Sequence, residues 1–349
     1  MDSPFTPERM KILIVKLSAF GDIIHTLPAL NDLMQRPEVD EIHWLVDSRY
    51  AFVTDTFPEQ IRVTNVALKG KTPLKSAWQT IKKLRKEKFD AIIDLQGLIK
   101  SGVIARSIGS PVYGFDRNHT PETPNALLTH PVAFHPDEKH VVQWYRRIAA
   151  APFAEHPEQP PSTPFSYTPP QITLPTNLRE QTHSLLNELG LPVDQYVVLN
   201  MGGGYATKRL PDATWRETAR QIAEKKLTPL LLWGNEEEQM RAVAIAGNDS
   251  MIRIMPRRLD TGSLCNLLSA CHTLISADTG VLHLAAALNV NTISFWGPTQ
   301  PDTLGPLGKN DRHLIASVDC INCRKRSCND FICMPKITPE SLLTKLGKR

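Results

Sequence analysis

The stretch SADTGVLHLA ends an apolar run with an acid, a hydroxyl and a glycine, and then continues as a helical pattern. Asp278 closes the run, so the free N–H groups of Thr279, Gly280 and Val281 are expected at a helix N-terminus. Such groups bind phosphate without a charged side chain. Asp278 would repel a bare phosphate, so it either caps the helix or holds a bridging water or metal. His283 either reaches a pyrophosphate or packs. Together these residues favour a nucleotide diphosphate.

A second candidate site follows the first apolar strand, in KLSAFGDIIHTLPAL. Gly21 permits a tight turn, and Asp22 then lies near the start of the next helix. Asp22 is either a first-turn acid stabilised by the helix dipole or a general base at the carboxyl end of a strand. Lys16, inside an otherwise apolar strand, either reaches an anion or extends its ammonium to solvent. A similar strand end, IDLQGLIKSG, gathers Asp94, Gln96 and Lys100 around a glycine.

The second half of the chain adds positive charge and a glycine-rich turn. QYVVLN runs into MGGGYATKRLP, where the glycines allow close approach to a ligand and Lys208 supplies a cation. The spacing is not that of a P-loop, and a flexible loop is the alternative. LLLWGNEEEQ ends a strand with three glutamates, one of which could accept hydrogen bonds from ribose hydroxyls while the others begin a helix.

The elements that must position these residues alternate between short apolar strands and amphipathic helices, which predicts parallel α/β sheets. The stretch HPEQPPSTPFSYTPP interrupts the alternation and predicts a proline-rich linker. The fold class is therefore α/β, with two doubly wound domains facing each other across a cleft. Ligands of such sheets sit outside the carboxyl ends of the strands.

Composition narrows the classes of function. The chain has 349 residues and a formal net charge of +4, which suits an anionic substrate or membrane surface but is too weak to indicate nucleic acid. No apolar run approaches the roughly 20 residues of a membrane span, and no secretory signal is recognised, so we expect a cytoplasmic protein. The basic stretch from Lys69 to Lys88 is either a solvated helix face or a patch for an anionic acceptor or membrane headgroups. The missing dinucleotide fingerprint disfavours an NAD-dependent oxidoreductase.

The motifs KLSAFGDIIHTLPAL, IDLQGLIKSG, LLWGNEEE and SADTGVLHLAAAL followed by SFWGPT occur in an order that resembles glycosyltransferase family 9, the lipopolysaccharide heptosyltransferases. The resemblance spans about residues 10–340. It implies the GT-B fold, two Rossmann-like domains with a deep cleft. The implied domains are an acceptor-binding domain over 10–155, a linker over 156–175, an ADP-sugar domain over 176–338 and a terminal helix over 339–349.

The resemblance also implies roles for individual residues. Asp22 matches the catalytic base of a single inverting displacement, and Lys208 resembles the lysine that neutralises charge on the departing ADP. Lys16 looks like a contact of the acceptor or donor phosphate. Glu236 is similar to the ribose-binding acid, with Glu237 as the alternative by spacing. The residues implied at the pyrophosphate and sugar are Asp278, Thr279, Gly280 and His283.

One loop departs from the family pattern. The best-known members have hydroxyl residues where this chain has Gly203 and Gly204.

Four cysteines, Cys320, Cys323, Cys328 and Cys333, lie within the stretch 320–333 with C-x2-C-x4-C-x4-C spacing. Thiolates this close in sequence can complete a tetrahedral site, so the spacing predicts a structural zinc, or iron with an all-thiolate set. Free or redox-active thiols are the alternative. Catalysis requires no metal in this interpretation. Cys265 and Cys271 lie in an apolar helical pattern and are expected to be buried.

The sequence-based hypothesis is transfer of L-glycero-D-manno-heptose from ADP-heptose to a Kdo residue of the lipid A–Kdo inner core. The enzyme would work in the cytoplasm, peripheral to the inner membrane, with no nucleic-acid partner. The first alternative is another family 9 transferase with a later-heptose or different acceptor. A non-catalytic, nucleotide-sensing or metal-stabilised scaffold is the second, and an acid aimed into the cleft argues against it.

Overall fold

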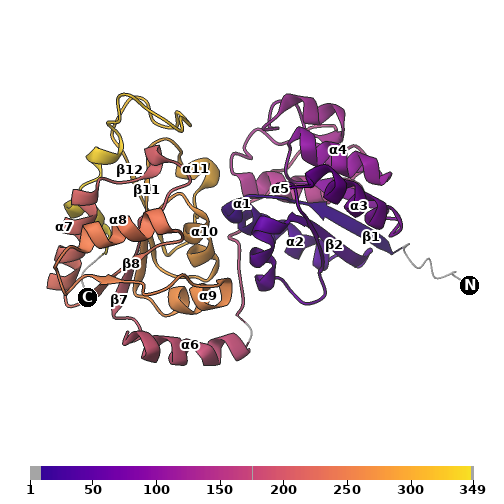
Figure 1. Cartoon of the computed structure of the whole chain (residues 1–349). Helices are drawn as coiled ribbons and strands as arrows, with labels where there is room; N and C mark the ends of the chain where they lie inside the picture. Colours follow the sequence, from indigo (N-terminus) through magenta and orange to yellow (C-terminus); the bar gives the residue numbers. More distant parts are fainter. Residues whose placement is uncertain (1–8, 175, 347–349) are drawn as a thin grey trace, which may run out of the picture. The chain divides into compact units, whose positions relative to one another are not determined.

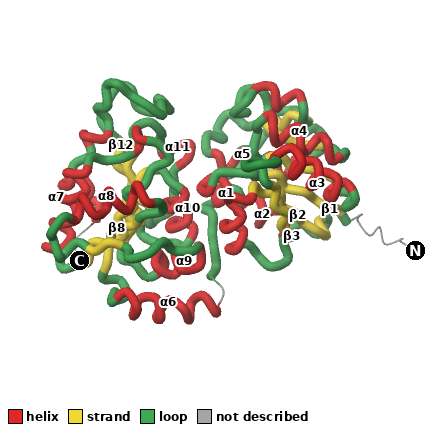
Figure 2. Tube along the Cα trace, in the orientation of Figure 1, coloured by secondary structure: helices red, strands yellow, loops and turns green. Residues whose placement is uncertain are grey.

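Two parallel six-stranded sheets organise the chain in the computed structural model, which describes residues 9–174 and 176–346. The chain divides between Thr168 and Pro169 into two compact units with one sheet each, coloured along the sequence in Figure 1. Figure 2 shows helices covering both faces of each sheet. The predicted α/β class with two doubly wound units is confirmed. No helix in the described residues is both long enough and apolar enough to cross a bilayer.

The sheet of the first unit has the strand order β3-β2-β1-β4-β5-β6, with every neighbouring pair parallel. Its strands are β1 (Met10–Val15), β2 (Val39–Asp47), β3 (Arg62–Val66), β4 (Ala91–Asp94), β5 (Val112–Phe115) and β6 (His130–Val132). Its helices are α1 (Phe20–His25), α2 (Leu27–Met34), α3 (Pro73–Arg85), α4 (Ile99–Ile108) and α5 (Val141–Ala150), with 3₁₀ segments η1 (Ser48–Thr56), η2 (Thr123–Leu127) and η3 (Ala151–Phe153).

The helices of the first unit form a layer on each face of the sheet. The crossovers β3–α3–β4 and β4–α4–β5 run in the same direction along the sheet, so right-handed connections place α3 and α4 on the same face, where they pack together. Helices α2 and α5 pack against each other on the opposite face. Burial on both faces explains why the central strand β1 reads as a continuous apolar run, with Ile12 through Val15 fully buried.

The helix expected after the first strand is two helices in the structure. Helix α1 starts at Phe20 and ends at His25, and α2 starts at Leu27. Pro28 explains the break, because proline fits the first turn of α2 but has no N–H to continue the ladder of α1. Asp22 therefore lies at the third position of a short helix of its own.

The sheet of the second unit has the strand order β12-β11-β10-β7-β8-β9. Its strands are β7 (Tyr196–Asn200), β8 (Thr228–Leu232), β9 (Arg253–Ile254), β10 (Thr273–Ala277), β11 (Thr292–Trp296) and β12 (Asp311–Ile315). Its helices are α6 (Thr176–Leu189), α7 (Asp212–Glu224), α8 (Glu236–Ala246), α9 (Thr261–Ser269), α10 (Gly280–Ala287), α11 (Pro301–Leu304) and α12 (Pro339–Leu346), with 3₁₀ segments η4 (Ala206–Lys208) and η5 (Met334–Lys336).

The proline-rich stretch is irregular, as predicted, but part of it is fastened to the first unit. Residues 154–174 form no helix or strand. Arg147 on α5 donates to the carbonyl of Thr163 at 2.8 Å, and Arg146 donates to the carbonyl of Ser166 at 3.0 Å. The stretch up to Thr168 is therefore held by side chains of α5, which explains why the division between the units falls late in the predicted linker.

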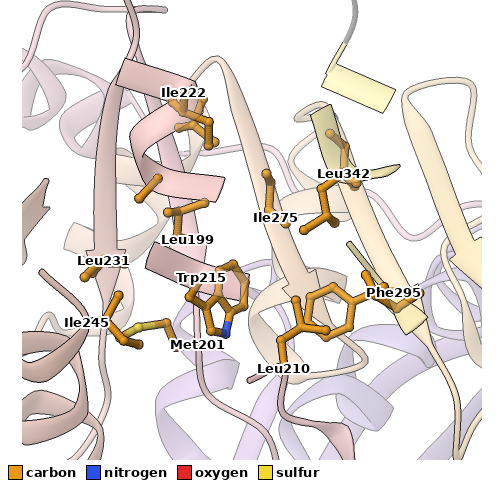
Figure 3. Close-up of a cluster of buried hydrophobic side chains, with 14 of the residues drawn as sticks. Leu199, Met201, Leu210, Trp215, Ile222, Leu231, Ile245, Ile275, Phe295 and Leu342 are labelled. Atoms are coloured by element: carbon orange, nitrogen blue, oxygen red, sulfur yellow. The ribbon is translucent and has the colours of Figure 1, made fainter. Parts of the chain in front are cut away.

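The core of the second unit forms around Trp215 on α7, which is fully buried (Figure 3). Its ring meets Phe295 of β11 edge to face, with 5.8 Å between ring centroids. The terminal helix α12 adds Leu342, Leu343 and Leu346 to the same cluster. This helix therefore packs within the second unit, while the last three residues of the predicted 339–349 helix lie outside the described residues.

We predict that Leu342→Ala destabilises the second unit by about 2–5 kcal/mol, because it leaves a cavity in a well-packed core. The exposed Lys345→Ala on the same helix is the control and should change stability by less than about 0.5 kcal/mol. Chemical denaturation of the full chain measures both. Equal stability of the two variants would show that α12 does not complete the core.

Candidate functional site

The turn after β1 carries Asp22 on a helix that the acid itself helps to begin. Asp22 Oδ2 accepts a hydrogen bond from the backbone N–H of Ala19 at 3.1 Å, and the residue is half-buried. Asp22 is therefore an acid in the first turn of α1, which is one of the two interpretations of the sequence. This position does not exclude a base, because a carboxylate has further acceptor positions and this one remains accessible to solvent.

Gln96 fixes the backbone that leads to Asp22. Its Oε1 accepts from the N–H of Leu17 at 2.9 Å and from that of Ser18 at 2.8 Å, although it lies about 80 residues away along the chain. Gln96 itself follows β4, the neighbour of β1, so strand pairing brings the two turns together. The sequence pointed to Gln96 as a polar residue at the sheet edge, but only the structure shows that it positions the catalytic candidate.

Asp94 organises the turn on which Gln96 lies. It is fully buried and accepts four hydrogen bonds, from the N–H groups of Gln96 and Gly97 at 3.0 and 3.3 Å, from Ser101 Oγ at 2.9 Å and from Asn125 Nδ2 at 2.8 Å. Burial raises its pKa, and these four donors oppose that shift. Asp94 therefore has a structural role, with no acceptor position directed to a ligand by these contacts.

Lys16 is almost fully buried and does not extend its ammonium to solvent. Its Nζ donates to the carbonyl of Leu95 at 2.9 Å and to Tyr145 Oη at 2.7 Å. Burial lowers the pKa of Lys16, and the negative charges of Asp22 and Asp94 counter that shift. Lys16 is therefore held beside the Asp22 turn by protein groups, and its contact with a phosphate stays a prediction.

The N-terminus of α10 in the second unit is built by side chains from two neighbouring strands. Thr279 is the N-cap, with its hydroxyl facing the N–H of Leu282 at 3.5 Å. Asn200, at the end of β7, donates from Nδ2 to Ser276 Oγ and to Thr279 Oγ1, each at 2.9 Å. Asn200 is opposite Ser276 in the register of β7 and β10, which explains the contact. Thr279, Gly280 and Val281 remain half-exposed, so the start of this helix is open to a ligand.

Asn200 and Ser276 are functional candidates that the motif-based reasoning missed. Both are polar residues at or near the end of an apolar strand, and both are buried. That position is the signal that could have identified them, since a buried polar side chain at the carboxyl end of a parallel strand needs a partner in the adjoining turn.

Asp278 does not cap α10 but binds two basic side chains. Its Oδ2 accepts from Lys208 Nζ at 2.6 Å, and its Oδ1 lies 3.2 Å from His283 Nε2. Burial alone would raise the pKa of Asp278, but the hydrogen bond from His283 and the charge of Lys208 hold it well below its usual range. The acid that would repel a phosphate is thus neutralised by an ion pair.

The structure brings together Lys208, Asp278 and His283 beside the N-terminus of α10. Lys208 Nζ also donates to the main-chain carbonyl of Asp278 at 3.1 Å and lies 4.8 Å from the centroid of the Tyr205 ring. Residue 208 comes from the segment after β7 and residue 278 from the end of β10, which is the strand beside it. A positioned cation, a helix N-terminus and a histidine can together bind a diphosphate.

The three glutamates after β8 have different surroundings. Glu238 accepts from the N–H of Gly234 at 2.8 Å, while Asn235 Oδ1 accepts from the N–H of Glu238 at 2.9 Å, so Glu238 belongs to the start of α8. Glu237 pairs with Arg209 at 2.8 Å. Glu236 is exposed and has no partner among the described residues, which leaves its carboxylate available to a ligand.

The glycine-rich segment does not require glycine at every position. A Cβ at Gly202 would lie 2.8 Å from Glu238 Oε1, whereas a Cβ at Gly204 would meet nothing within 4 Å. Neither residue has positive φ. A hydroxyl side chain at position 204 is therefore compatible with this backbone.

The four clustered cysteines do not form the predicted metal site in the structure. Cys320 and Cys323 are exposed and Cys328 and Cys333 are half-buried, all with free thiols. Within residues 9–174 and 176–346, no group of three or more His, Cys, Asp or Glu side chains is placed to hold a metal ion.

Backbone contacts set the shape of the cysteine loop. The N–H of Asn322 donates to the carbonyl of Gly297 and that of Arg324 to the carbonyl of Pro298, both at 2.8 Å. Asn322 and Arg324 have positive φ. The end of β11 therefore anchors this loop. Cys265 and Cys271 are buried, as predicted.

Comparisons with known proteins agree with this geometry. The model of Glycosyltransferase family 9 (heptosyltransferase) matches residues 77–331. Lipopolysaccharide heptosyltransferase 1 of Pseudomonas aeruginosa is 30% identical over 97% of this chain and 97% of its own length. The enzyme of the same name from Escherichia coli K12 is 30% identical, covering 86% of this chain and 92% of its own. The solved E. coli heptosyltransferase WaaC with ADP is similar with a TM-score of 0.74 and 25% identity over 96% of this chain and 98% of that one.

We predict that Gln96→Leu destabilises the chain by about 1–3 kcal/mol, because it leaves the buried N–H of Leu17 and the part-buried N–H of Ser18 without their acceptor. Gln79→Leu, at an exposed helix position, is the control. Denaturant unfolding compares the two variants, and an unchanged midpoint for Gln96→Leu would show that this bond does not hold the turn.

We also predict that the stabilising effect of Asp278 depends on pH. The folded pKa of Asp278 is depressed, so its contribution is fully present above its usual pKa of 3.8 and is lost as the pH falls below that value. Asp278→Asn should cost about 3 kcal/mol or more near neutral pH, since it breaks a buried ion pair.

The measurement is thermal unfolding of wild type and Asp278→Asn from pH 7 downward. The difference in stability between wild type and Asp278→Asn should narrow below about pH 4. The exposed Asp330→Asn should be as stable as wild type throughout. A difference that is constant across this range would contradict an ionised, paired Asp278.

Proposed function

The chain belongs to glycosyltransferase family 9, and from that membership we propose that it transfers heptose from ADP-heptose to a Kdo residue of the lipopolysaccharide inner core. The observation that carries this proposal is near full-length similarity, at 30% identity, to a relative named lipopolysaccharide heptosyltransferase 1. The similar solved structure is named as a complex with ADP, which supports an adenine nucleotide as the donor's leaving group.

The donor's diphosphate is proposed to lie at the N-terminus of α10. Thr279 and Gly280 are half-exposed there, and their N–H groups are oriented by the Thr279 cap and by Asn200. Lys208, held by Asp278, supplies a fixed positive charge beside them. As the bond from the anomeric carbon to ADP breaks, negative charge grows on the phosphate, so these groups stabilise the transition state more than the ground state.

His283 and Glu236 are proposed to bind the rest of the donor. His283 is buried against Asp278, and its bond to that carboxylate orients the imidazole ring toward the start of the helix. Glu236 begins α8 at the carboxyl end of β8, where an acid can accept hydrogen bonds from ribose hydroxyls. Glu237 is less suited because Arg209 already occupies its carboxylate.

Asp22 is proposed as the base that takes the proton of the acceptor hydroxyl while that oxygen attacks the anomeric carbon. One C–O bond forms as the bond to ADP breaks, so the configuration inverts in a single step. Lys16 contributes from behind the turn as a buried cation, since both of its hydrogen bonds are to the protein. A lipid-anchored acceptor places the reaction at the cytoplasmic surface of the inner membrane.

The test of the proposed function is transfer from ADP-heptose to Kdo2–lipid A, with and without a heptose already attached. Product with the bare acceptor alone supports the proposal. Product with the heptosylated acceptor alone would make the chain a transferase of a later heptose, and no product with either would contradict the proposed acceptor.

We predict that Asp22→Asn lowers kcat by about 10²–10⁴-fold, because the amide cannot accept the proton. The variant retains an oxygen that can accept from Ala19 N–H, so the turn and the thermal stability should be preserved. Single-turnover transfer measures the loss, and ADP binding by calorimetry should match wild type. Near wild-type turnover would contradict the assignment of Asp22 as the base.

We further predict that Gly204→Ser is tolerated, since a side chain there meets open space. Thermal stability should change by less than about 0.5 kcal/mol, and the KM for ADP-heptose should be equal to or lower than that of wild type. Gly202→Ser is the contrasting variant, because its side chain would meet Glu238. A loss of donor binding in Gly204→Ser would show that the ligand approaches the backbone at position 204 too closely for a side chain.

A further inference from the structure

The outer surface of α3 exposes two large apolar side chains that no other part of residues 9–174 and 176–346 covers. Leu74 is 85% exposed and Trp78 is 63% exposed. They lie one helical turn apart, so they share a face of α3. On the neighbouring helix α4, Ile99 and Val103 are also exposed and also lie one turn apart. Exposed apolar side chains grouped on two helices that pack together mark an interaction surface, whereas single ones do not.

The same two helices carry positive charge and no acid. Neither Pro73–Arg85 nor Ile99–Ile108 contains an aspartate or glutamate. Their basic residues are Lys75, Lys82, Lys83, Arg85, Lys100 and Arg106. The single acid between Lys69 and Lys88 is Glu87, which pairs with Lys11 at 2.6 Å. The charge of this surface is therefore not balanced by its own helices.

Charge and apolar groups are interleaved along one stripe of α3. Leu74, Trp78 and Lys82 follow each other at four-residue spacing. Lys82 Nζ lies 5.3 Å from the centroid of the Trp78 ring. An amphipathic ring beside long basic side chains suits an interface where apolar chains and anionic headgroups meet.

We propose that the α3/α4 surface docks on an anionic lipid bilayer, with Trp78 and Leu74 entering the headgroup region and the lysines contacting lipid phosphates. The proposal rests on the proposed function in one respect, because a lipid-anchored acceptor requires the enzyme to reach a membrane. Charge complementarity selects a bilayer as the occupant, since each basic residue near an anionic leaflet adds to the attraction.

A comparison within the chain shows that exposure alone does not define this surface. Helix α8 in the second unit exposes Met240 to 68%, yet its first turn holds three glutamates. An anionic bilayer would repel that turn. Met240→Ala is therefore a control variant with a similar loss of exposed apolar area and no expected loss of membrane binding.

The test is co-sedimentation of the full chain with vesicles of phosphatidylglycerol and phosphatidylcholine, and with phosphatidylcholine alone. Wild type should bind only the anionic vesicles. Lys75→Gln with Lys82→Gln should weaken that binding by roughly fivefold for each lysine, hence about 25-fold together. Trp78→Ala should weaken it with unchanged thermal stability, and Met240→Ala should bind as wild type does.

Three results would overturn the proposal. The first is unchanged vesicle binding in both α3 variants, and the second is an equal loss in Met240→Ala. The third is displacement of wild type from vesicles by inorganic phosphate at the concentration of the lipid phosphate. That result would indicate single phosphate groups as the ligand instead of a bilayer.

Transfer assays separate this proposal from the proposed function. The α3 variants should lose heptose transfer to Kdo2–lipid A embedded in anionic vesicles while keeping transfer to the same acceptor after removal of its acyl chains. If wild type transfers heptose to neither acceptor but the variants still lose vesicle binding, the proposed function fails and the docking surface stands. Equal transfer by wild type and variants on the vesicle-embedded acceptor would contradict docking through α3.

Discussion

Backbone groups at the carboxyl ends of parallel strands must find hydrogen-bond partners outside the sheet, and both candidate sites depend on how this chain supplies them. In the first unit Gln96 accepts from two N–H groups after β1, and Asp94 accepts from two after β4. In the second unit Asn200 joins β7, β10 and the cap of α10. Buried polar side chains thus hold the turns in one conformation, which gives the exposed residues on them fixed positions.

Each candidate site contains a buried charged residue, but the sign of that charge differs between the two sites. The first keeps a buried cation, Lys16, behind a half-exposed acid, Asp22. The second keeps an acid, Asp278, behind the start of a helix, where it holds Lys208 and His283. Asp278 binds the side chains proposed to act on the donor, whereas Lys16 interacts with Asp22 through its charge and not through a hydrogen bond. Removing either member of the Lys208–Asp278 pair should therefore affect folding and chemistry together, whereas Asp22→Asn should affect chemistry alone.

Much of the fold could be predicted because this sequence has clear apolar runs that are bounded by glycine, proline and polar residues. The apolar runs at 11–17 and 273–278 match β1 and β10 closely, since buried parallel strands read as continuous apolar segments. The break between α1 and α2 at Pro28 was missed, because a proline in the first turn of a helix looks like a proline within one long helix.

Side-chain pairing was harder to predict than side-chain placement. Lys208 and Asp278 were both placed near a phosphate, yet their ion pair joins residues 70 apart and depends on the neighbouring positions of β7 and β10. Lys16 Nζ likewise binds Leu95 and Tyr145, which lie 79 and 129 residues further along the chain. The cysteine spacing predicted a metal, whereas the loop follows backbone bonds to Gly297 and Pro298 that spacing does not encode.

The central claim is that the N-terminus of α10 binds the diphosphate of the donor. Amide NMR of the labelled full chain during titration with ADP tests it most directly. Binding at this site predicts saturable shifts of the Thr279, Gly280 and Val281 amides that are lost or weakened in Lys208→Met. Shifts confined to the Asp22 turn, or shifts at α10 that Lys208→Met leaves unchanged, would contradict it.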